Sequence, residues 1–255
     1  MHYPDLLPDV LNIADAAGVK VMEIYNSDFK VAYKADNSPV TAADLAAHTV
    51  ILAGLQSLTP DIPVLSEEAA TAPWSQRRRW FRFWLVDPID GTKEFTQRSG
   101  EFTVNIALIE HGRPVLGVVT APALQQAYWG AAGEGAWKRD GEPGQQRVRR
   151  IHVVVPSPTA RVLASKNHLD DATRAYIGTL GPQRLVQAGS SLKFCRIAEG
   201  SADLYPRLGP TSEWDTGAGH AVLAAAGGRV ITFSGGPLRY GKPDVLNPHF
   251  IAAGK

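Results

Sequence analysis

One stretch of the sequence decides how the chain is organised: Trp80-Phe-Arg-Phe-Trp-Leu-Val-Asp87-Pro-Ile-Asp90-Gly-Thr92. Its first seven residues are almost all apolar, which predicts a buried strand. Pro88 has a fixed φ and no backbone donor, so we expect the strand to end there in a turn. In such a turn Asp87 and Asp90 can point into one cavity, and the carbonyl of Ile89 is left free to bind a cation.

The residues after Asp90 favour an anion site beside these carboxylates. Gly91 has no side chain, so the backbone can approach an anion closely. The amides of Gly91 and Thr92 are predicted to open a short helix, and the first amides of a helix have no intrahelical acceptor. A helix N-terminus of this kind can bind phosphate.

Two further acidic segments reinforce the prediction. Glu67 and Glu68 directly follow a strand candidate at residues 62–65, and Asp215 begins a helix rich in small residues that must pack closely on a neighbour. Carboxylate and carbonyl oxygens select Mg²⁺, Mn²⁺ or Ca²⁺ over zinc. The alternatives are structural: a polar turn at Asp87–Gly91, and a helix cap at Asp215.

The rest of the chain predicts a mixed α/β protein. Helices are expected at 6–25, 41–58, 169–180, 191–199 and 215–226; strands are expected at 62–65, 80–86, 151–155, 161–164, 184–187 and 202–205, with three or four more between 102 and 137. Gly141–Gln146 is the softest segment, so we expect a metal-site subdomain at 1–145 and an α/β subdomain at 146–255. The basic triplet Arg77–Arg79 is interpreted as a solvated turn.

Composition excludes several classes of function. A net charge of +1 over 255 residues gives no indication of a basic surface that would bind nucleic acid. The single cysteine, Cys195, excludes an intramolecular disulfide and a cysteine-based zinc cluster, and we interpret it as a buried structural thiol. No signal peptide or membrane-spanning segment is expected. The sequence therefore predicts a cytoplasmic protein, a monomer or homodimer, and leaves peripheral association with the inner membrane open.

Four motifs in order resemble those of the inositol monophosphatase superfamily of metal-dependent, lithium-sensitive phosphatases. They are Ser38-Pro-Val-Thr-Ala-Ala-Asp44, Glu67-Glu68, Asp87-Pro-Ile-Asp-Gly-Thr92 and Trp214-Asp-x-x-Ala-Gly219. The resemblance covers essentially the whole chain and implies an α/β/α/β sandwich of two subdomains. One position departs from the pattern, because Gly217 stands where alanine is usual.

Within the superfamily the chain looks most like the bacterial 3′(2′),5′-bisphosphate nucleotidases. The stretches Gly100–Leu108, Gly189–Cys195 and Leu204–Arg207 carry this likeness. That group removes the 3′-phosphate of 3′-phosphoadenosine 5′-phosphate, a by-product of sulfate assimilation, and leaves AMP. The alternatives are an inositol monophosphatase or other sugar-phosphate phosphatase with the same site, and a non-catalytic metal- or nucleotide-binding protein on the same scaffold.

The resemblance also implies the metal ligands. Glu67, Asp87 and the Ile89 carbonyl would hold a first Mg²⁺. Asp87, Asp90 and Asp215 would hold a second, and Glu67 would help to place a third, weaker ion.

The remaining implied roles concern water and substrate. Thr92, paired with Asp44, would orient and deprotonate a metal-activated water that attacks phosphorus directly, with no phosphoenzyme. The residues expected to face the substrate are Gly91, Thr92, His168, Ser190, Lys193, Arg207 and Asp215. Lys193 and Arg207 suit the 5′-phosphate, although Lys193 can equally be a solvated helix residue.

Overall fold

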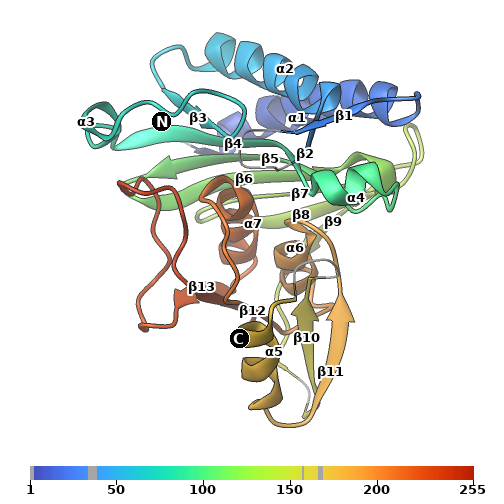
Figure 1. Cartoon of the computed structure of the whole chain (residues 1–255), viewed down its shortest axis with the longest axis vertical. Coiled ribbons are helices and arrows are strands. Elements are labelled where there is room, and N and C mark those ends of the chain that lie inside the picture. Colours follow the sequence, from blue (N-terminus) through green and yellow to red (C-terminus); the bar gives the residue numbers. More distant parts are fainter. Residues whose placement is uncertain (1–2, 34–38, 157, 166–168) are drawn as a thin grey trace.

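The chain folds into stacked layers of helices and sheets (Figure 1). The computed structural model describes residues 3–33, 39–156, 158–165 and 169–255. Helices α1 and α2 cover one face of a seven-stranded sheet, and α6 and α7 lie between its other face and a five-stranded sheet. The predicted layered α/β arrangement is therefore confirmed.

The outer helices follow the apolar spacing of the sequence. Helix α1 (Leu7–Tyr25) is preceded by a 3₁₀ turn (Tyr3–Leu6), and α2 (Ala42–Leu58) ends just before Pro60. Thr41 caps α2 as expected, because its side chain accepts a hydrogen bond from Ala43 N while the Asp44 carboxylate accepts one from Thr41 N. This reciprocal cap satisfies two backbone donors at the start of α2.

The large sheet is antiparallel except at one edge. Its order is β3 (Val64–Ser66), β4 (Arg82–Asp90), β5 (Thr103–Glu110), β6 (Arg113–Ala121), β7 (Gln126–Ala131), β8 (Gly135–Asp140) and β9 (Arg147–Ile151), with β3 parallel to β4. Strand β4 is buried on both sides: Trp84 and Val86 belong to the core beneath α1 and α2, and Leu85 belongs to the core beneath α7.

The end of β4 differs from the expected turn. The strand continues through Pro88 to Asp90, with a register shift between the pairs Asp87–Asn105 and Asp90–Thr103. Two residues of β4, Pro88 and Ile89, therefore lie opposite one residue of β5, which is the arrangement of a β-bulge. Proline is tolerated there because a bulge interrupts the ladder hydrogen bonds. Like the expected turn, the bulge changes the direction of the chain after Asp87.

The second half builds the smaller sheet. Its order is β11 (Gln183–Gln187), β10 (Ala160–Ala164), β12 (Leu204–Arg207), β14 (Phe250–Ala253) and β13 (Arg229–Thr232). The helices of this half are α5 (Asp171–Gly178), α6 (Leu192–Ala198) and α7 (Trp214–Ala225), each close to its predicted range. The other short elements are β1 (Val31–Tyr33), β2 (Pro39–Thr41), α3 (Trp74–Arg77), α4 (Thr92–Thr96) and a 3₁₀ turn at Pro122–Leu124.

Two expectations for single segments were wrong. Only Ile151 of the predicted strand 151–155 lies in a strand; Val153 instead donates its amide to Ala226 O after the end of α7. Arg77, expected in a solvated turn, is 6% exposed and donates to the carbonyls of Ala72, Lys242 and Pro243. Its long side chain satisfies carbonyls from two separate loops.

Strand β9 forms the far edge of the large sheet. It starts just after the expected boundary at residue 145 and, within the described part of the chain, pairs only with β8. Four of its five residues are exposed, and three of these are arginines, Arg147, Arg149 and Arg150. The proposed division into 1–145 and 146–255 stays a prediction.

Small residues let α7 lie against the sheet at backbone distance. A Cβ added at Gly117 of β6 would stand 2.4 Å from the carbonyl oxygen of Ala218, and one added at Gly217 would stand 2.7 Å from Leu85 Cδ2. The glycine at 217, where alanine is usual in the superfamily, thus gives Leu85 room. The expected close packing of this helix is confirmed.

We predict that Gly117→Ala destabilises the fold by about 1–3 kcal/mol, because the added methyl meets backbone that cannot move aside. Urea unfolding of the purified variant measures this. Gly178→Ala is the matched control: that glycine has no neighbour near its Cβ position and lies in a helix, so the change should be neutral or mildly stabilising. Equal stability of the Gly117 variant and the wild type would contradict the close-packing argument.

Candidate metal centre

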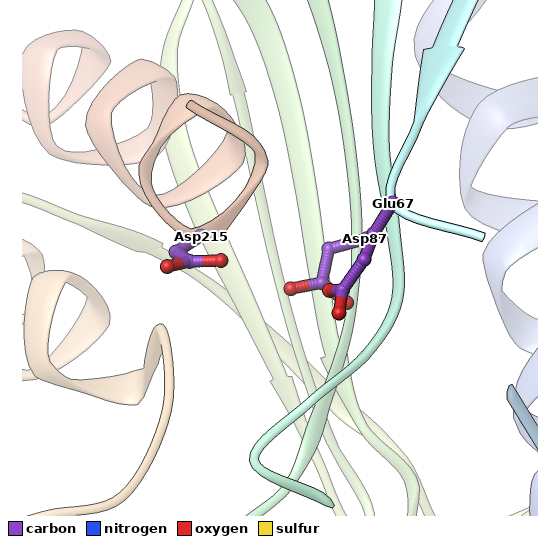
Figure 2. Close-up of side chains that lie close together, drawn as sticks. All are labelled: Glu67, Asp87 and Asp215. Carbon is purple, nitrogen blue, oxygen red and sulfur yellow. The ribbon is translucent and has the colours of Figure 1, made fainter. Parts of the chain in front are cut away.

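Two carboxylates meet because β3 and β4 are parallel neighbours. Glu67 directly follows β3, and its amide donates to Val86 O of β4 at 3.2 Å. Asp87 follows Val86 on the face of β4 that carries Leu85, and it is 1% exposed. Because the carboxyl ends of the two strands lie at the same edge, both side chains reach the same space (Figure 2).

The third carboxylate comes from the start of α7. Asp215 lies in its first turn and accepts a hydrogen bond from Ser212 N at 2.8 Å. Figure 2 shows it facing Glu67 and Asp87, and one oxygen from each of the three residues lies within 4.8 Å of the others. The structure thus brings together three of the predicted metal ligands from three separate elements.

Burial and mutual repulsion oppose the ionisation of these carboxylates and raise their pKa values. Burial and the charges of Glu67 and Asp90 raise the pKa of Asp87 well above its usual value. Burial and the neighbouring Asp90 raise the pKa of Asp215 to about 8. Burial raises that of Asp90 to about 6, against the opposing effect of Lys193. Close packing of like charges is therefore costly in the protein alone.

Asp90 is held from the second half of the chain. Ser191 Oγ lies 3.0 Å from Asp90 Oδ2, and Ser190 Oγ donates to the backbone oxygen of Asp90 at 2.7 Å. Gly91 follows with φ +90°, and a Cβ there would stand 2.1 Å from Ser190 Oγ. Only glycine fits at this position, because both the left-handed backbone and the serine contact exclude a side chain.

The donor set fits a hard divalent cation. All candidate ligands offer oxygen, the class of atom that Mg²⁺, Mn²⁺ and Ca²⁺ prefer. Neither carboxylate oxygen of Asp87 has a hydrogen-bond partner among the described residues, although both are buried. Buried polar atoms are normally satisfied, so a cation between the carboxylates would supply the missing partner and remove the repulsion. Ile89, whose carbonyl was expected to be a ligand, lines the same cavity.

This cavity is large and carries both signs of charge. Its volume is about 740 Å³, and it extends from the carboxylates to Lys193 and Arg207. Lys193 is 5% exposed, so it is not a solvated helix residue; burial lowers its pKa to about 8. Arg207 Nε is buried and has no partner within the described part of the chain. Thr92 and Ser190 line the same cavity, as predicted.

Not every predicted site residue is placed by the structure. Asp44 is buried, and both hydrogen bonds described for it, from the amide and the hydroxyl of Thr41, end on its Oδ2. Its charge is close enough to contribute to the raised pKa of Asp87. Its pairing with Thr92 stays a prediction. His168 lies outside the described residues, as does Ser38 of the first motif.

Sequence reasoning missed part of the cavity wall. Phe194 and Tyr205 also line the cavity, and Ser191 touches Asp90 directly. Phe194 and Tyr205 carry ordinary core spacing in the sequence. The Ser190-Ser191 pair belongs to a stretch that pointed to the site. The sequence does not show which of the two serines contacts the backbone of Asp90 and which contacts its carboxylate.

Comparison with known proteins settles the family. A family model described as the inositol monophosphatase family matches residues 7–254. The chain belongs to the inositol monophosphatase family. It is therefore a phosphatase, and its acidic cluster agrees with the metal dependence of this family. No described helix is long and apolar enough to cross a membrane.

Relatives within the inositol monophosphatase family share nearly the whole chain. The 3′(2′),5′-bisphosphate nucleotidase CysQ of Escherichia coli K12 is 51% identical over 248 residues, which cover 96% of this chain and 98% of that protein. The crystal structure of CysQ from Bacteroides thetaiotaomicron is 40% identical, with a TM-score of 0.88 over 100% of this chain and 98% of that one. An inositol monophosphatase from Anabaena, 24% identical over 99% and 92% of the two chains with a TM-score of 0.78, shares the fold.

We predict that Asp215→Asn stabilises the metal-free protein near neutral pH. The raised pKa means that the folded state resists losing this proton, so stability is fully present below the unfolded pKa and falls as pH rises toward about 8. Asparagine keeps the acceptor for Ser212 N and removes the charge. A gain of about 1 kcal/mol would raise Tm by about 2–4 °C in a chain of this size.

Thermal unfolding at pH 7.5 in chelator measures this effect, with exposed Asp61→Asn as the control. Added Mg²⁺ should then raise Tm of the wild type and of the control more than that of the Asp215 variant. A lower Tm for the Asp215 variant in chelator would contradict the electrostatic account.

Proposed function

We propose that the protein is an Mg²⁺-dependent 3′(2′),5′-bisphosphate nucleotidase that converts 3′-phosphoadenosine 5′-phosphate to AMP and phosphate. This activity recycles a by-product of sulfur assimilation in the cytoplasm. Support comes from relatives about half identical over nearly the full length, which carry this name. The cavity supports it independently.

The observation that carries the proposal is the pair of cations in the cavity. Lys193 and Arg207 lie close enough for the Arg207 charge to help lower the pKa of Lys193, and both line the space that reaches the carboxylates. Lys193 is buried and Arg207 is half-buried, and two cations that repel each other favour a bound anion, just as the carboxylates favour a bound cation. A substrate with two phosphates fits both, one phosphate at the carboxylate end and one at Lys193 and Arg207.

The carboxylates would hold two or three Mg²⁺ ions. Glu67, Asp87 and the Ile89 carbonyl would bind one; Asp87, Asp90 and Asp215 would bind another, with Asp87 shared; Glu67 would help to hold a weaker third. When bound, such ions neutralise phosphoryl oxygens, stabilise the leaving oxygen and lower the pKa of water.

The chain's own groups orient the reaction. Thr92 stands at the first position of α4, beside Gly91, where backbone amides can donate to a phosphoryl oxygen. Its hydroxyl can accept a hydrogen bond from the attacking water and pass a proton toward Asp44. Cys195 is fully buried and its pKa is raised by that burial, so it is unsuited to attack phosphorus. The proposed reaction is therefore a direct attack by water, without a phosphoenzyme.

An inositol monophosphatase activity is the second candidate. It would use the same carboxylates, and proteins named for it share the fold. However, inositol 1-phosphate carries a single phosphate and would leave Lys193 and Arg207 with no phosphate to bind. The cation pair therefore favours the bisphosphate.

Phosphate release from 3′-phosphoadenosine 5′-phosphate tests the proposal, with inositol 1-phosphate measured beside it, each with Mg²⁺ and with excess chelator. We expect fast release from the nucleotide alone, abolished by the chelator. Release mainly from inositol phosphate would overturn the substrate assignment and keep the metal site. Release that persists in chelator would overturn the metal assignment.

We predict that Lys193→Ala raises KM for 3′-phosphoadenosine 5′-phosphate by about 10- to 100-fold. A hydrogen bond to a charged group contributes about 1.5–3 kcal/mol, and each 1.4 kcal/mol is tenfold. Adenosine 3′-phosphate lacks the second phosphate, so its KM should change little. Lys20→Ala, an exposed lysine on α1, serves as the control. Equal effects on both substrates would remove Lys193 from the pocket for the second phosphate.

A further inference from the structure

The hydroxyl of Ser191 lies between the two segments that carry Asp90 and Asp215. Its oxygen is 3.0 Å from Asp90 Oδ2 and 2.9 Å from the backbone oxygen of Asp215. Ser191 is 1% exposed, so water does not compete for these contacts. We propose that Ser191 is a positioning residue of the metal centre, whose hydroxyl fixes the Asp90 carboxylate relative to the first turn of α7. This inference rests on the proposed function.

The contact matters because the two ligands come from separate parts of the fold. Asp90 ends the bulged strand β4 of the large sheet, whereas Asp215 lies in the first turn of α7. Each raises the pKa of a buried neighbour through charge repulsion, so the carboxylates alone would move apart. A hydroxyl between them gives Asp90 a donor and α7 a fixed neighbour. The Ser191 hydroxyl has one hydrogen, which it can donate to the Asp90 carboxylate or to the backbone oxygen of Asp215. Both acceptors lie within hydrogen-bond distance of the same oxygen atom.

The chain around Ser191 is itself held firmly. Ser190 adopts φ +50°, a left-handed conformation that is uncommon outside glycine, and its hydroxyl donates to Asp90 O. Gly189 donates its amide to Glu101 Oε2 at 3.0 Å, and a Cβ there would stand 2.8 Å from Glu101 O. Strained backbone persists only where its surroundings over-determine it. The segment 189–191 is therefore a rigid support from which the hydroxyl can act.

Ser191 and its neighbour have different tasks. Ser190 contacts backbone and lines the cavity, where we place it among the substrate-facing residues. Ser191 contacts the carboxylate of a proposed metal ligand through its side chain. Ser191→Ala removes one oxygen and little volume, so packing changes little, while Asp90 keeps the backbone hydrogen bond from residue 191 and loses the side-chain one. Groups that orient metal ligands typically contribute about 10- to 100-fold to metal affinity or activity.

The test is a Mn²⁺ titration without substrate, in which the EPR signal of the free ion reports how much is bound. We expect Ser191→Ala to weaken the binding of at least one ion by about 10- to 100-fold. Ser201→Ala is the matched control, because that hydroxyl donates to Arg196 O at the other end of α6. The control should bind Mn²⁺ and unfold in chelator as the wild type does. Ser191→Ala should stay folded in chelator, with Tm lower by no more than about 2–4 °C for the one buried hydrogen bond it loses.

A kinetic measurement separates positioning from a general structural role. In Ser191→Ala the Mg²⁺ concentration for half-maximal rate should rise by a similar factor, and kcat should recover at saturating Mg²⁺. Unchanged Mn²⁺ affinity in the Ser191 variant, or equal weakening in the Ser201 control, would overturn the role of Ser191 alone. A wild-type protein that binds no Mn²⁺ at millimolar concentration would overturn the proposed function itself.

Discussion

Helix α7 touches the large sheet at backbone distance, and the rest of the structure depends on this contact. Gly117 of β6 lets the backbone of α7 approach the sheet, and Gly217 of α7 leaves room for the Leu85 side chain, so the first turn of the helix reaches the end of β4. An ordinary helix–sheet separation, set by larger side chains, would carry Asp215 away from Asp87. The metal centre thus depends on two glycines that have no polar chemistry of their own.

The carboxylates oppose that contact in the metal-free protein. Burial and like charge raise the pKa values of Asp87, Asp90 and Asp215 together, which means that ionising them strains the junction between the two sheets. The hydrophobic core around Phe194 and Leu85, joined by the serine contacts at residues 190–191, keeps the junction closed. Part of the folding free energy thus offsets the repulsion within a cation site that is formed before an ion binds.

The sequence predicted the elements and the ligand set because both leave local signals. Helical spacing and the cap at Thr41 located α2 to the residue, and acidic residues after buried strands indicated where β3 and β4 end. Local pattern could not show the bulge, because Pro88 is compatible with a turn and with an interrupted ladder. It also could not show that Lys193 is buried or that Ser191 bridges two ligands, since these depend on how distant elements pack.

The open edge of the large sheet at β9 affects how two copies of the chain can pair. Among the described strands, β9 pairs with β8 alone, and an edge with unpaired backbone groups can recruit another strand. Arg147, Arg149 and Arg150 stand exposed along it. Two copies meeting edge to edge would bring arginines opposite arginines and lose the hydration of those charges, which disfavours pairing. The row of arginines therefore disfavours extension of the sheet by a second copy at this edge.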